Sequence, residues 1–299
     1  MNILITGGTG LLGRNLCKVL LEEGHVLTVL SRNPDTVPAI CGAGVHGMAG
    51  LDEWRPDQTF DAVINLAGEP IVDARWTAKR KQALWDSRIA LTEKLVQRIA
   101  AARYKPGVLL SGSAVGYYGN RGDTGLDESA VPGNDFAARL CIAWEQSAHV
   151  AEYSGVRVCM LRTGLVLCRP GGLLGRLLPP FKLGLGARLG NGKQWMSWVH
   201  IDDYVAMLLG LLHETRASGP YNMTAPQPVT NAEFTAALAA TLHRPAPFVI
   251  PAVLLKWGMG ERASLLLEGQ KVLPKRMTEA GFHFSYANLA DALHDLLGG

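Results

Sequence analysis

Three glycines near the start of the chain, Gly7, Gly10 and Gly13, have a spacing that suits the binding of a pyrophosphate. Gly7 and Gly10 permit a tight turn with bare backbone close to a ligand, and Gly13 permits a helix to pack closely. Leu11 and Leu12 open that helix, whose free N–H groups and partial positive charge attract phosphate oxygens. The segment therefore predicts a nucleotide-binding turn, with an ordinary strand-to-helix turn as the simpler alternative.

The elements on either side of these glycines are those that such a turn requires. An apolar run over 3–5 predicts a short buried strand, and apolar residues recur at helical spacing over 11–23. Apolar and β-branched residues over 25–30 then predict a second strand. Strand, glycine turn, helix and strand in this order favour a dinucleotide-binding fold.

Ser31 and Arg32, which follow the second predicted strand, bear on the choice of dinucleotide. A protein that prefers NAD carries an acidic residue there to bind the ribose 2′-hydroxyl. A hydroxyl and a guanidinium suit a 2′-phosphate instead, because arginine offers a planar fork of donors. We therefore expect NADPH (NADP) to be preferred, with a solvated Arg32 as the alternative. Asp35, three residues further on, takes the role of the missing acidic residue and restores NAD binding only if the loop folds back toward the ribose.

Residues 36–58 are rich in loop signals and leave little room for a normal helix. A further strand is predicted over 60–66, and it ends in Leu66, Ala67 and Gly68. Small residues at the carboxyl end of a parallel strand leave space for adenine and ribose. An ordinary turn is the alternative here as well.

Hydroxyl groups at the end of the next strand are placed for substrate chemistry. A long helix containing Arg88 is predicted over 78–103, and a strand over 107–110 leads to Ser111 and Ser113. We expect Arg88 and Ser111 to contact the cofactor, with a solvated helix charge and a turn former as the simpler alternatives. Hydroxyl groups beside a nicotinamide can form hydrogen bonds with a carbonyl or alcohol substrate.

The rest of the chain predicts further helices and one more strand. Residues 179–196 show little periodicity, so we expect them to lie outside the nucleotide-binding part. Asp202 or Asp203 is expected to cap the helix over 204–212. The other predicted elements are helices over 136–153, 231–242, 252–267 and 287–297 and a strand over 156–167.

Composition excludes several classes of protein. The chain has 299 residues, 48% of them apolar, which allows a substantial core. Its five cysteines include no CxxC pair, so we expect neither a disulfide framework nor a metal site, and we expect a reducing compartment, the cytoplasm. A net charge of +3 with scattered cations predicts no nucleic-acid partner. No apolar run approaches the roughly 18 residues of a membrane span, so no membrane partner is expected.

Taken in order, these segments resemble the extended short-chain dehydrogenase/reductase family, also called the NAD-dependent epimerase family. The resemblance rests on TGGTGLLG, NLAG, SGSAVGYYG, LRTGLVL and WVHIDD. More narrowly, NLAGEPI, LPPFKLGLG, TNAEF and LLLEGQKVLPKRM resemble its atypical YfcH-like branch.

The resemblance implies an α/β fold, a Rossmann-type doubly wound parallel sheet with a smaller C-terminal substrate lobe. The cofactor domain would be 1–168 plus about 197–223, and the lobe about 169–196 plus 224–299. It also implies that Val166 lies near the nicotinamide and that Ser113 takes the place of the catalytic serine or threonine.

The chain departs from this family where protons are transferred. Ordinary members carry Tyr-x-x-x-Lys, in which the lysine lowers the pKa of the tyrosine. A glutamate often follows that lysine by four residues. If Glu145 takes the place of this glutamate, Cys141 stands where the lysine would be and Ala137 where the tyrosine would be. None of the seven tyrosines has a lysine four residues later. Tyr117 or Tyr118 is therefore the candidate donor, with His200 a weaker one.

Three functions stay open from the sequence. The first is an NADPH-binding atypical oxidoreductase that acts on a small carbonyl or alcohol. The second is a nucleotide-sugar epimerase, and the third is an NADPH-binding sensor or scaffold without turnover. The sequence does not predict the oligomeric state. Candidates for the substrate side of the cleft are Arg75, Trp76, Lys193, Trp195 and Trp198, and then Gln270, Lys271 and Arg276.

Overall fold

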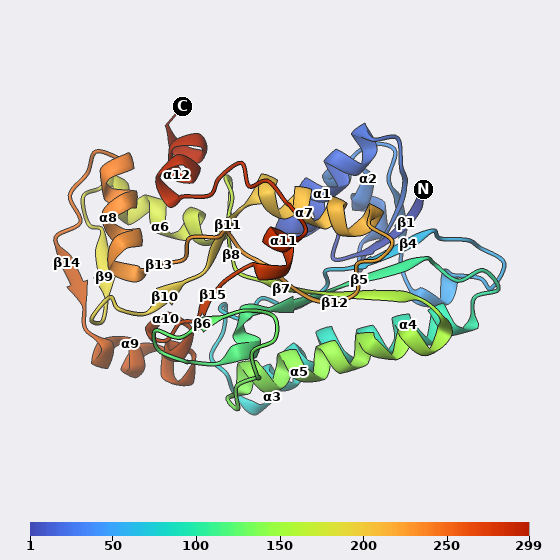
Figure 1. The fold of residues 1–299 in the computed structure, drawn as a ribbon, viewed down its shortest axis with the longest axis horizontal. Coiled ribbons are helices and arrows are strands. Elements are labelled where there is room, and N and C mark those ends of the chain that lie inside the picture. Colours follow the sequence, from blue (N-terminus) through green and yellow to red (C-terminus); the bar gives the residue numbers. More distant parts are fainter. Residues whose placement is uncertain (299) are drawn as a thin grey trace.

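A seven-stranded sheet organises the computed structural model, which describes residues 1–298 (Figure 1). The strand order is β12-β7-β5-β4-β1-β2-β3, and all neighbours are parallel. Successive strands run outward from β1 in one direction and then from β4 in the other, which confirms the predicted doubly wound α/β fold. The strands are β1 (Asn2–Thr6), β2 (Val26–Leu30), β3 (His46–Met48), β4 (Ala62–Asn65), β5 (Val108–Ala114), β7 (Arg157–Thr163) and β12 (Gly219–Met223).

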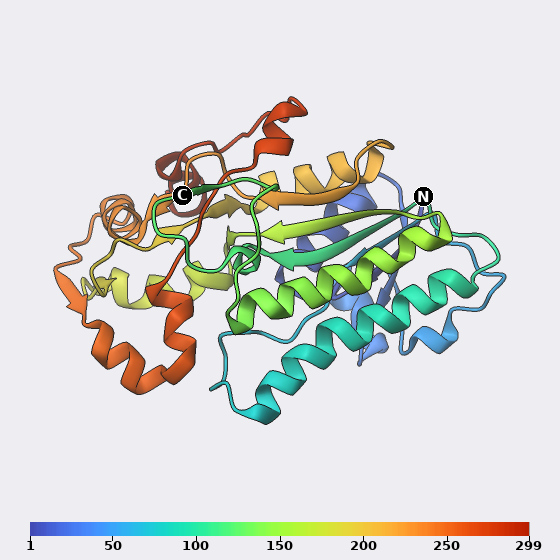
Figure 2. The same cartoon turned by 60° about the horizontal axis from the view of Figure 1, so that its bottom comes forward.

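Helices cover both faces of the sheet, so its strands are apolar on both sides. In β1, Ile3 and Ile5 join the core cluster under one helix layer, and Leu4 joins the cluster on the opposite face. Figures 1 and 2 show the two layers on either side of the sheet. One layer is α1 (Leu11–Glu22), α2 (Val37–Cys41) and α7 (Ile201–His213), and the other is α4 (Leu91–Ala101) and α5 (Phe136–His149).

The long predicted helix over 78–103 forms, with a local irregularity. It consists of α3 (Ala78–Trp85), a π-helical turn η3 (Asp86–Ala90) and α4. The hydroxyl of Thr77 accepts the N–H of Arg80 and so caps its start. Such π-turns recur at functional sites.

The C-terminal part packs a core of its own around the buried side chains of Trp198 and Phe234. Its helices are α6 (Gly172–Lys182), α8 (Asn231–Thr241) and α12 (Leu289–Leu297). Short pairs of strands accompany them: β8 (Leu165–Leu167) with β11 (Trp198–His200), β9 (Ala187–Leu189) with β14 (Phe248–Ile250), β10 (Trp195–Met196) with β13 (Val229–Thr230), and β6 (Gly125–Leu126) with β15 (Lys271–Val272).

Several predicted boundaries were wrong. The strand over 156–167 divides into β7 and β8 at Gly164, where a Cβ would lie 2.3 Å from the carbonyl oxygen of Ser197. The helix over 252–267 breaks at Gly260, whose φ is +62°. The remaining elements are α9 (Ala252–Met259), α10 (Ser264–Leu267), α11 (Lys275–Glu279), and the 3₁₀ turns η1 (Pro34–Thr36), η2 (Leu51–Glu53), η4 (Val115–Tyr118), η5 (Val150–Ser154) and η6 (Gly260–Ala263).

Candidate functional site

A hollow of about 1310 Å³ opens at the carboxyl ends of β1, β2 and β4. We call it the glycine-turn hollow. It lies where the strand order reverses, which is where ligands bind in open α/β sheets. Seven of the predicted cofactor residues line it: Gly7, Gly10, Ser31, Arg32, Leu66, Ala67 and Gly68. The glycine turn and Arg32 therefore face one common space.

The glycine turn fits a phosphate on the geometry of its own backbone. Gly7 has a φ of +72°, and a Cβ there would lie 2.6 Å from the carbonyl carbon of Leu66. A Cβ on Gly13 would lie 2.4 Å from the carbonyl oxygen of Gly7. The first turn of α1 has no side-chain cap and no acidic residue. Its N–H groups are thus free of protein carboxylates, as an anion site requires.

Arg32 stands at the rim of the hollow with an exposed side chain. Its Nη1 lies 3.3 Å from Oε1 of Glu69, whose other oxygen lies 3.3 Å from Nη1 of Arg80. The side chain of Arg32 is 91% exposed, so this ion pair is weak and a phosphate can compete for the guanidinium.

One wall of the hollow was missed in the sequence. Lys94, Gln97 and Ala101 line it from α4, at spacings of three and four residues. That spacing puts them on one face of a helix, so the helical pattern held the signal. Two cations, Lys94 and Arg98, add positive charge, although Arg98 pairs with Asp52. Other lining residues that were missed include Thr9, Asn33, Glu69 and Ser87.

The other predicted cofactor residues do not line the hollow: Leu11, Leu12, Gly13, Arg88, Ser111 and Val166. Leu11, Leu12 and Val166 pack against the core beneath α1 and α7. A Cβ on Gly172 would lie 2.9 Å from Cδ2 of Leu11 and 3.7 Å from the carbonyl oxygen of Val166, so these residues meet at the start of α1. Ser111 is fully buried, and its hydroxyl accepts a bond from Asn65 at 3.2 Å.

Arg88 supports the wall of the hollow from behind. Its Nη2 donates to the carbonyl of Glu69 at 3.0 Å and its Nη1 to the carbonyl of Leu84 at 3.3 Å. A Cβ on Gly68 would lie 2.9 Å from Cζ of Arg88. These bonds give Arg88 a structural role, because they fix the loop after β4; its cofactor contact stays a prediction.

A buried ion pair occupies the predicted catalytic position. Ser113 donates its hydroxyl proton to Oε1 of Glu145 at 2.6 Å. Glu145 in turn accepts from Nε and Nη2 of Arg162, each at 2.9 Å. All three residues are buried. Because its only proton is committed to Glu145, Ser113 can accept a hydrogen bond from a ligand but cannot donate one.

Tyr118 belongs to the same buried network. Its side chain is fully buried, its hydroxyl donates to Oδ1 of Asn222 at 2.7 Å, and it accepts from Arg162 at 2.9 Å. Burial raises the pKa of Tyr118 to about 12. Tyr118 is thus a structural residue and not the proton donor that the sequence predicted. Tyr117 is only half-buried, with Cζ of Arg162 3.5 Å from its ring centroid.

Small side chains fill the place of the missing Tyr-x-x-x-Lys pair. Ala137 and Cys141 face Gly116, where a Cβ would lie 3.5 Å from the Cβ of Ala137 and 4.0 Å from the Sγ of Cys141. Burial raises the pKa of Cys141 to about 12. A thiol of this kind carries no charge near neutral pH and cannot replace a lysine.

The WVHIDD segment has a structural role that differs from the predicted one. The cap of α7 is His200, whose Nδ1 accepts the N–H of Asp202 at 3.2 Å. Asp203 instead accepts the N–H groups of Ser285 and Tyr286, each at 2.9 Å. The ring centroids of His200 and Tyr286 are 3.8 Å apart. These contacts hold the C-terminal segment against α7.

The stability of the protein is expected to fall in mild acid through His200. Burial lowers the pKa of His200, so the folded state keeps the ring neutral while the unfolded chain, with an ordinary pKa of about 6.5, takes up a proton. Stability therefore rises with pH below about pH 6.5, by up to about 1.4 kcal/mol per pH unit. Urea unfolding of wild type and His200→Asn at about pH 7 and pH 5.5 measures this, because asparagine caps a helix without titrating. An equal fall in both proteins contradicts it.

Residues proposed for the substrate side mostly have protein partners. Trp198 is fully buried, and its Nε1 donates to the carbonyl of Gln227 at 2.9 Å. Arg276 donates to the carbonyl of Pro220 at 2.7 Å. Arg75 donates to the carbonyls of Trp257 and Gly258, at 3.3 and 3.0 Å. Trp198 and Arg276 are therefore structural, whereas Arg75 links the loop after β4 to α9.

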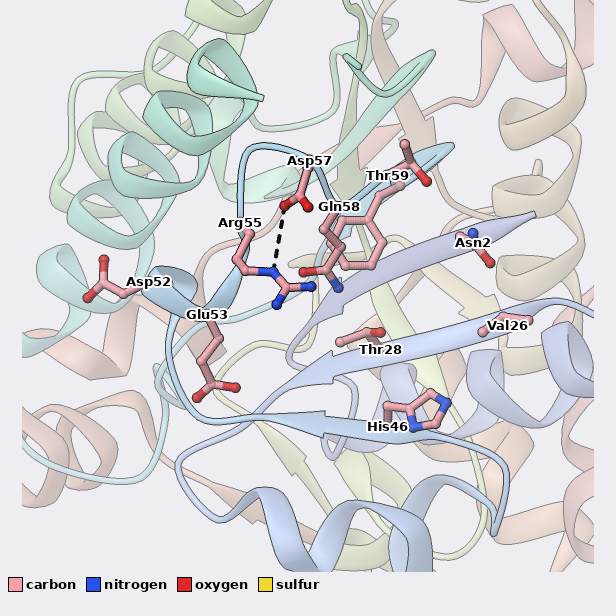
Figure 3. Close-up of a pocket in the computed structure, with 11 residues that line it drawn as sticks. Asn2, Val26, Thr28, His46, Asp52, Glu53, Arg55, Asp57, Gln58 and Thr59 are labelled. Atoms are coloured by element: carbon pink, nitrogen blue, oxygen red, sulfur yellow. Dashed lines mark ion pairs between the residues drawn. The ribbon is translucent and has the colours of Figure 1, made fainter. Parts of the chain in front are cut away.

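A second hollow of about 850 Å³ lies at the opposite ends of the strands (Figure 3). Asn2 and Val26, the first residues of β1 and β2, line it together with the loop over 52–60. Its one ion pair among the residues drawn, Arg55 with Asp57 at 3.6 Å, is exposed. Its lining has no glycine turn of the kind that holds the pyrophosphate in dinucleotide-binding folds.

Comparison with known proteins assigns the fold to a family. The model of the NAD dependent epimerase/dehydratase family matches residues 3–224. The chain belongs to the NAD-dependent epimerase/dehydratase family. Within this family, residues 250–296 also match a domain of unknown function, DUF1731.

Relatives in this epimerase family match nearly the full length of the chain. An epimerase family protein of Mycobacterium bovis is 41% identical, over 97% of this chain and 96% of its own. The chloroplastic SDR39U1 homolog of Arabidopsis thaliana is 39% identical, over 99% of this chain and 87% of its own. The crystal structure of human epimerase family protein SDR39U1 with NADPH has a TM-score of 0.91 at 34% identity and covers both chains completely.

Proposed function

We propose that this protein binds NADPH in the glycine-turn hollow. The observation that carries the proposal is that the glycine turn and Arg32 line the same space. The volume exceeds the roughly 300 to 1,000 Å³ of ordinary small-molecule pockets, which leaves room for a dinucleotide. The structure of a 34% identical relative with NADPH supports the same cofactor here.

Each part of the hollow has a separate task in this proposal. The N–H groups of the glycine turn and of α1 hold the pyrophosphate. Ser31 and Arg32 bind the 2′-phosphate, and Leu66, Ala67 and Gly68 leave space for adenine and ribose. Bound NADPH supplies a hydride. The division into a cofactor domain (1–168 plus about 197–223) and a substrate lobe (about 169–196 plus 224–299) agrees with β12 closing the sheet and with the separate C-terminal core.

We propose further that the protein is an atypical short-chain oxidoreductase of the YfcH-like branch, acting on a small carbonyl or alcohol. The Oγ atom of Ser113 would accept a hydrogen bond from the hydroxyl of the substrate in its alcohol form, because the proton of Ser113 is donated to Glu145. Tyr117 is then the remaining candidate donor near it. With all five cysteines free and buried, a reducing compartment such as the cytoplasm is proposed as its location.

A binding role without turnover is the second candidate. It is favoured by the commitment of Ser113, Tyr118 and Arg162 to one buried network, which leaves few groups for proton transfer. Consumption of NADPH by any substrate, lost in Ser113→Ala, would exclude it. A nucleotide-sugar epimerase is less well supported, since Arg32 favours NADPH; tightly retained NAD in the purified protein would favour it.

Arg32→Ala is expected to weaken NADPH binding about 10- to 100-fold and to leave NADH binding nearly unchanged. The variant removes one charge-assisted contact to the 2′-phosphate, worth roughly 1.5 to 3 kcal/mol, and only NADPH carries that group. Titration of NADPH and NADH fluorescence measures both affinities. Arg55→Ala, which removes an exposed arginine of the second hollow, is the matched control. Equal losses of affinity for the two cofactors would show that Arg32 does not bind the 2′-phosphate.

A further inference from the structure

Large apolar side chains are exposed together at one end of the C-terminal part. Eight of the sixteen exposed large hydrophobic residues among those described lie there. Trp257 is 83% exposed and Val253 is 75% exposed, and α9 has no buried residue at all. We call this surface the apolar end face; it consists of Leu183, Leu185, Phe248, Val249, Ile250, Val253, Leu254 and Trp257.

The segments that carry these residues lie next to one another. Nε of Arg244 donates to the carbonyl of Lys182 at 3.2 Å, and the N–H of Phe248 donates to the carbonyl of Gly186 at 3.4 Å. These two bonds join the turn after α6 to the segment of β14, which runs directly into α9. Figures 1 and 2 both show β14 and α9 at the end of the molecule that is remote from the N-terminus.

Cations predominate around the apolar end face; the first acid beyond it, Glu261, is half exposed and pairs with Lys81 at 2.7 Å. Lys182, Arg244 and Lys256 are exposed on the same segments. The chain has no aspartate or glutamate over 153–201 or over 234–260, the two stretches that build the face. An exposed tryptophan with leucines, valines and cations, on segments that themselves carry no acid, has the composition of a surface that lies on anionic lipid.

We propose that the apolar end face docks on an anionic membrane surface, with Trp257, Val253 and Leu254 entering the headgroup boundary. Lys182, Arg244 and Lys256 then lie at the level of the phosphates, where each cation is attracted to the negative surface. A second copy fits less well, because a two-fold contact brings the same cations together.

Docking on a surface differs from crossing it. Among residues 1–298, no helix is both long and apolar enough to span a bilayer. The expectation of no membrane partner rested on the length of apolar runs, which addresses spanning and not surface binding. The proposal does not depend on the reaction, since none of the eight residues lines the glycine-turn hollow.

Co-sedimentation of the full chain with vesicles tests the proposal. We expect binding to vesicles of phosphatidylcholine mixed with phosphatidylglycerol, weaker binding at high salt, and little binding to phosphatidylcholine alone. Trp257→Ser is expected to weaken binding roughly tenfold, and Lys256→Ala about fivefold. Tyr153→Ser removes an equally exposed aromatic ring, 86% exposed, from η5 just before β7, away from the apolar end face, and is expected to bind as wild type does.

Three results would overturn the proposal. The first is no binding to the anionic vesicles, or equal binding to neutral ones. The second is an equal loss of binding in Tyr153→Ser and Trp257→Ser. The third is self-association without lipid, measured by sedimentation velocity and abolished in Trp257→Ser, which would assign the face to a second copy. Circular dichroism of each variant establishes that it is folded.

Discussion

Glu145→Gln is expected to lower the free energy of unfolding by about 3 to 5 kcal/mol. Glu145 is 8% exposed and Arg162 is 3% exposed, and the two are joined by two hydrogen bonds of 2.9 Å. Removing the negative charge leaves the guanidinium buried without a counter-charge, which is far more costly than losing a surface pair. It also releases Ser113, whose proton Glu145 holds. Urea unfolding followed by circular dichroism measures the change.

Glu152→Gln is the matched control for this effect. Glu152 pairs with His149 at 3.3 Å, but both side chains are more than a third exposed. Its loss is therefore expected to change the free energy of unfolding by no more than about 0.5 kcal/mol. Equal effects at the two positions would show that the Glu145–Arg162 pair is not the ionic centre of this core.

Gly7→Ala is expected to abolish detectable NADPH binding and to destabilise the fold by roughly 1 to 3 kcal/mol. Gly7 has a φ of +72°, which an alanine tolerates poorly. The new Cβ would lie 2.6 Å from the carbonyl carbon of Leu66 and 2.7 Å from the nitrogen of Ala67. These are backbone atoms that cannot rotate away, so the turn and the opposite wall of the hollow must separate. NADPH titration and thermal melting measure the two effects.

Gly24→Ala separates the clash from the strain. Gly24 also has a positive φ, +79°, but a Cβ there would meet nothing within 4 Å. It lies just after α1, at the end remote from the glycine turn. We expect a similar strain on folding and unchanged NADPH binding. If Gly7→Ala bound NADPH normally, or if Gly24→Ala also failed to bind it, the phosphate site would lie elsewhere.

The lining of the glycine-turn hollow was largely predictable because its signals are local. The glycine turn, the strand before it and the helix after it occupy fewer than about 25 residues, and each obeys a short-range rule. Arg32 follows β2 directly, so its position in the sheet fixes its place at the hollow. Lys94, Gln97 and Ala101, which line the hollow from α4, also follow helical spacing. The sequence pattern shows that they share a face, but the order of the strands is needed to show that this face lines the hollow.

The buried network around Ser113 was not predictable because its partners are distant in the sequence. Ser113 and Glu145 are 32 residues apart, and Tyr118 and Asn222 are 104 apart. A serine and two tyrosines after a strand look equally available in the sequence, and only packing distinguishes the half-buried Tyr117 from the buried Tyr118. The helix cap by His200 was missed for a simpler reason, since aspartate is the commoner cap and two aspartates follow it.

The affinity of the wild-type protein for NADPH and for NADH, measured by isothermal titration calorimetry, tests the central claim most directly. A glycine turn and a guanidinium on one hollow predict that NADPH binds with one molecule per chain and at least about tenfold more tightly than NADH. Tighter binding of NADH, or no binding of either dinucleotide, would contradict it.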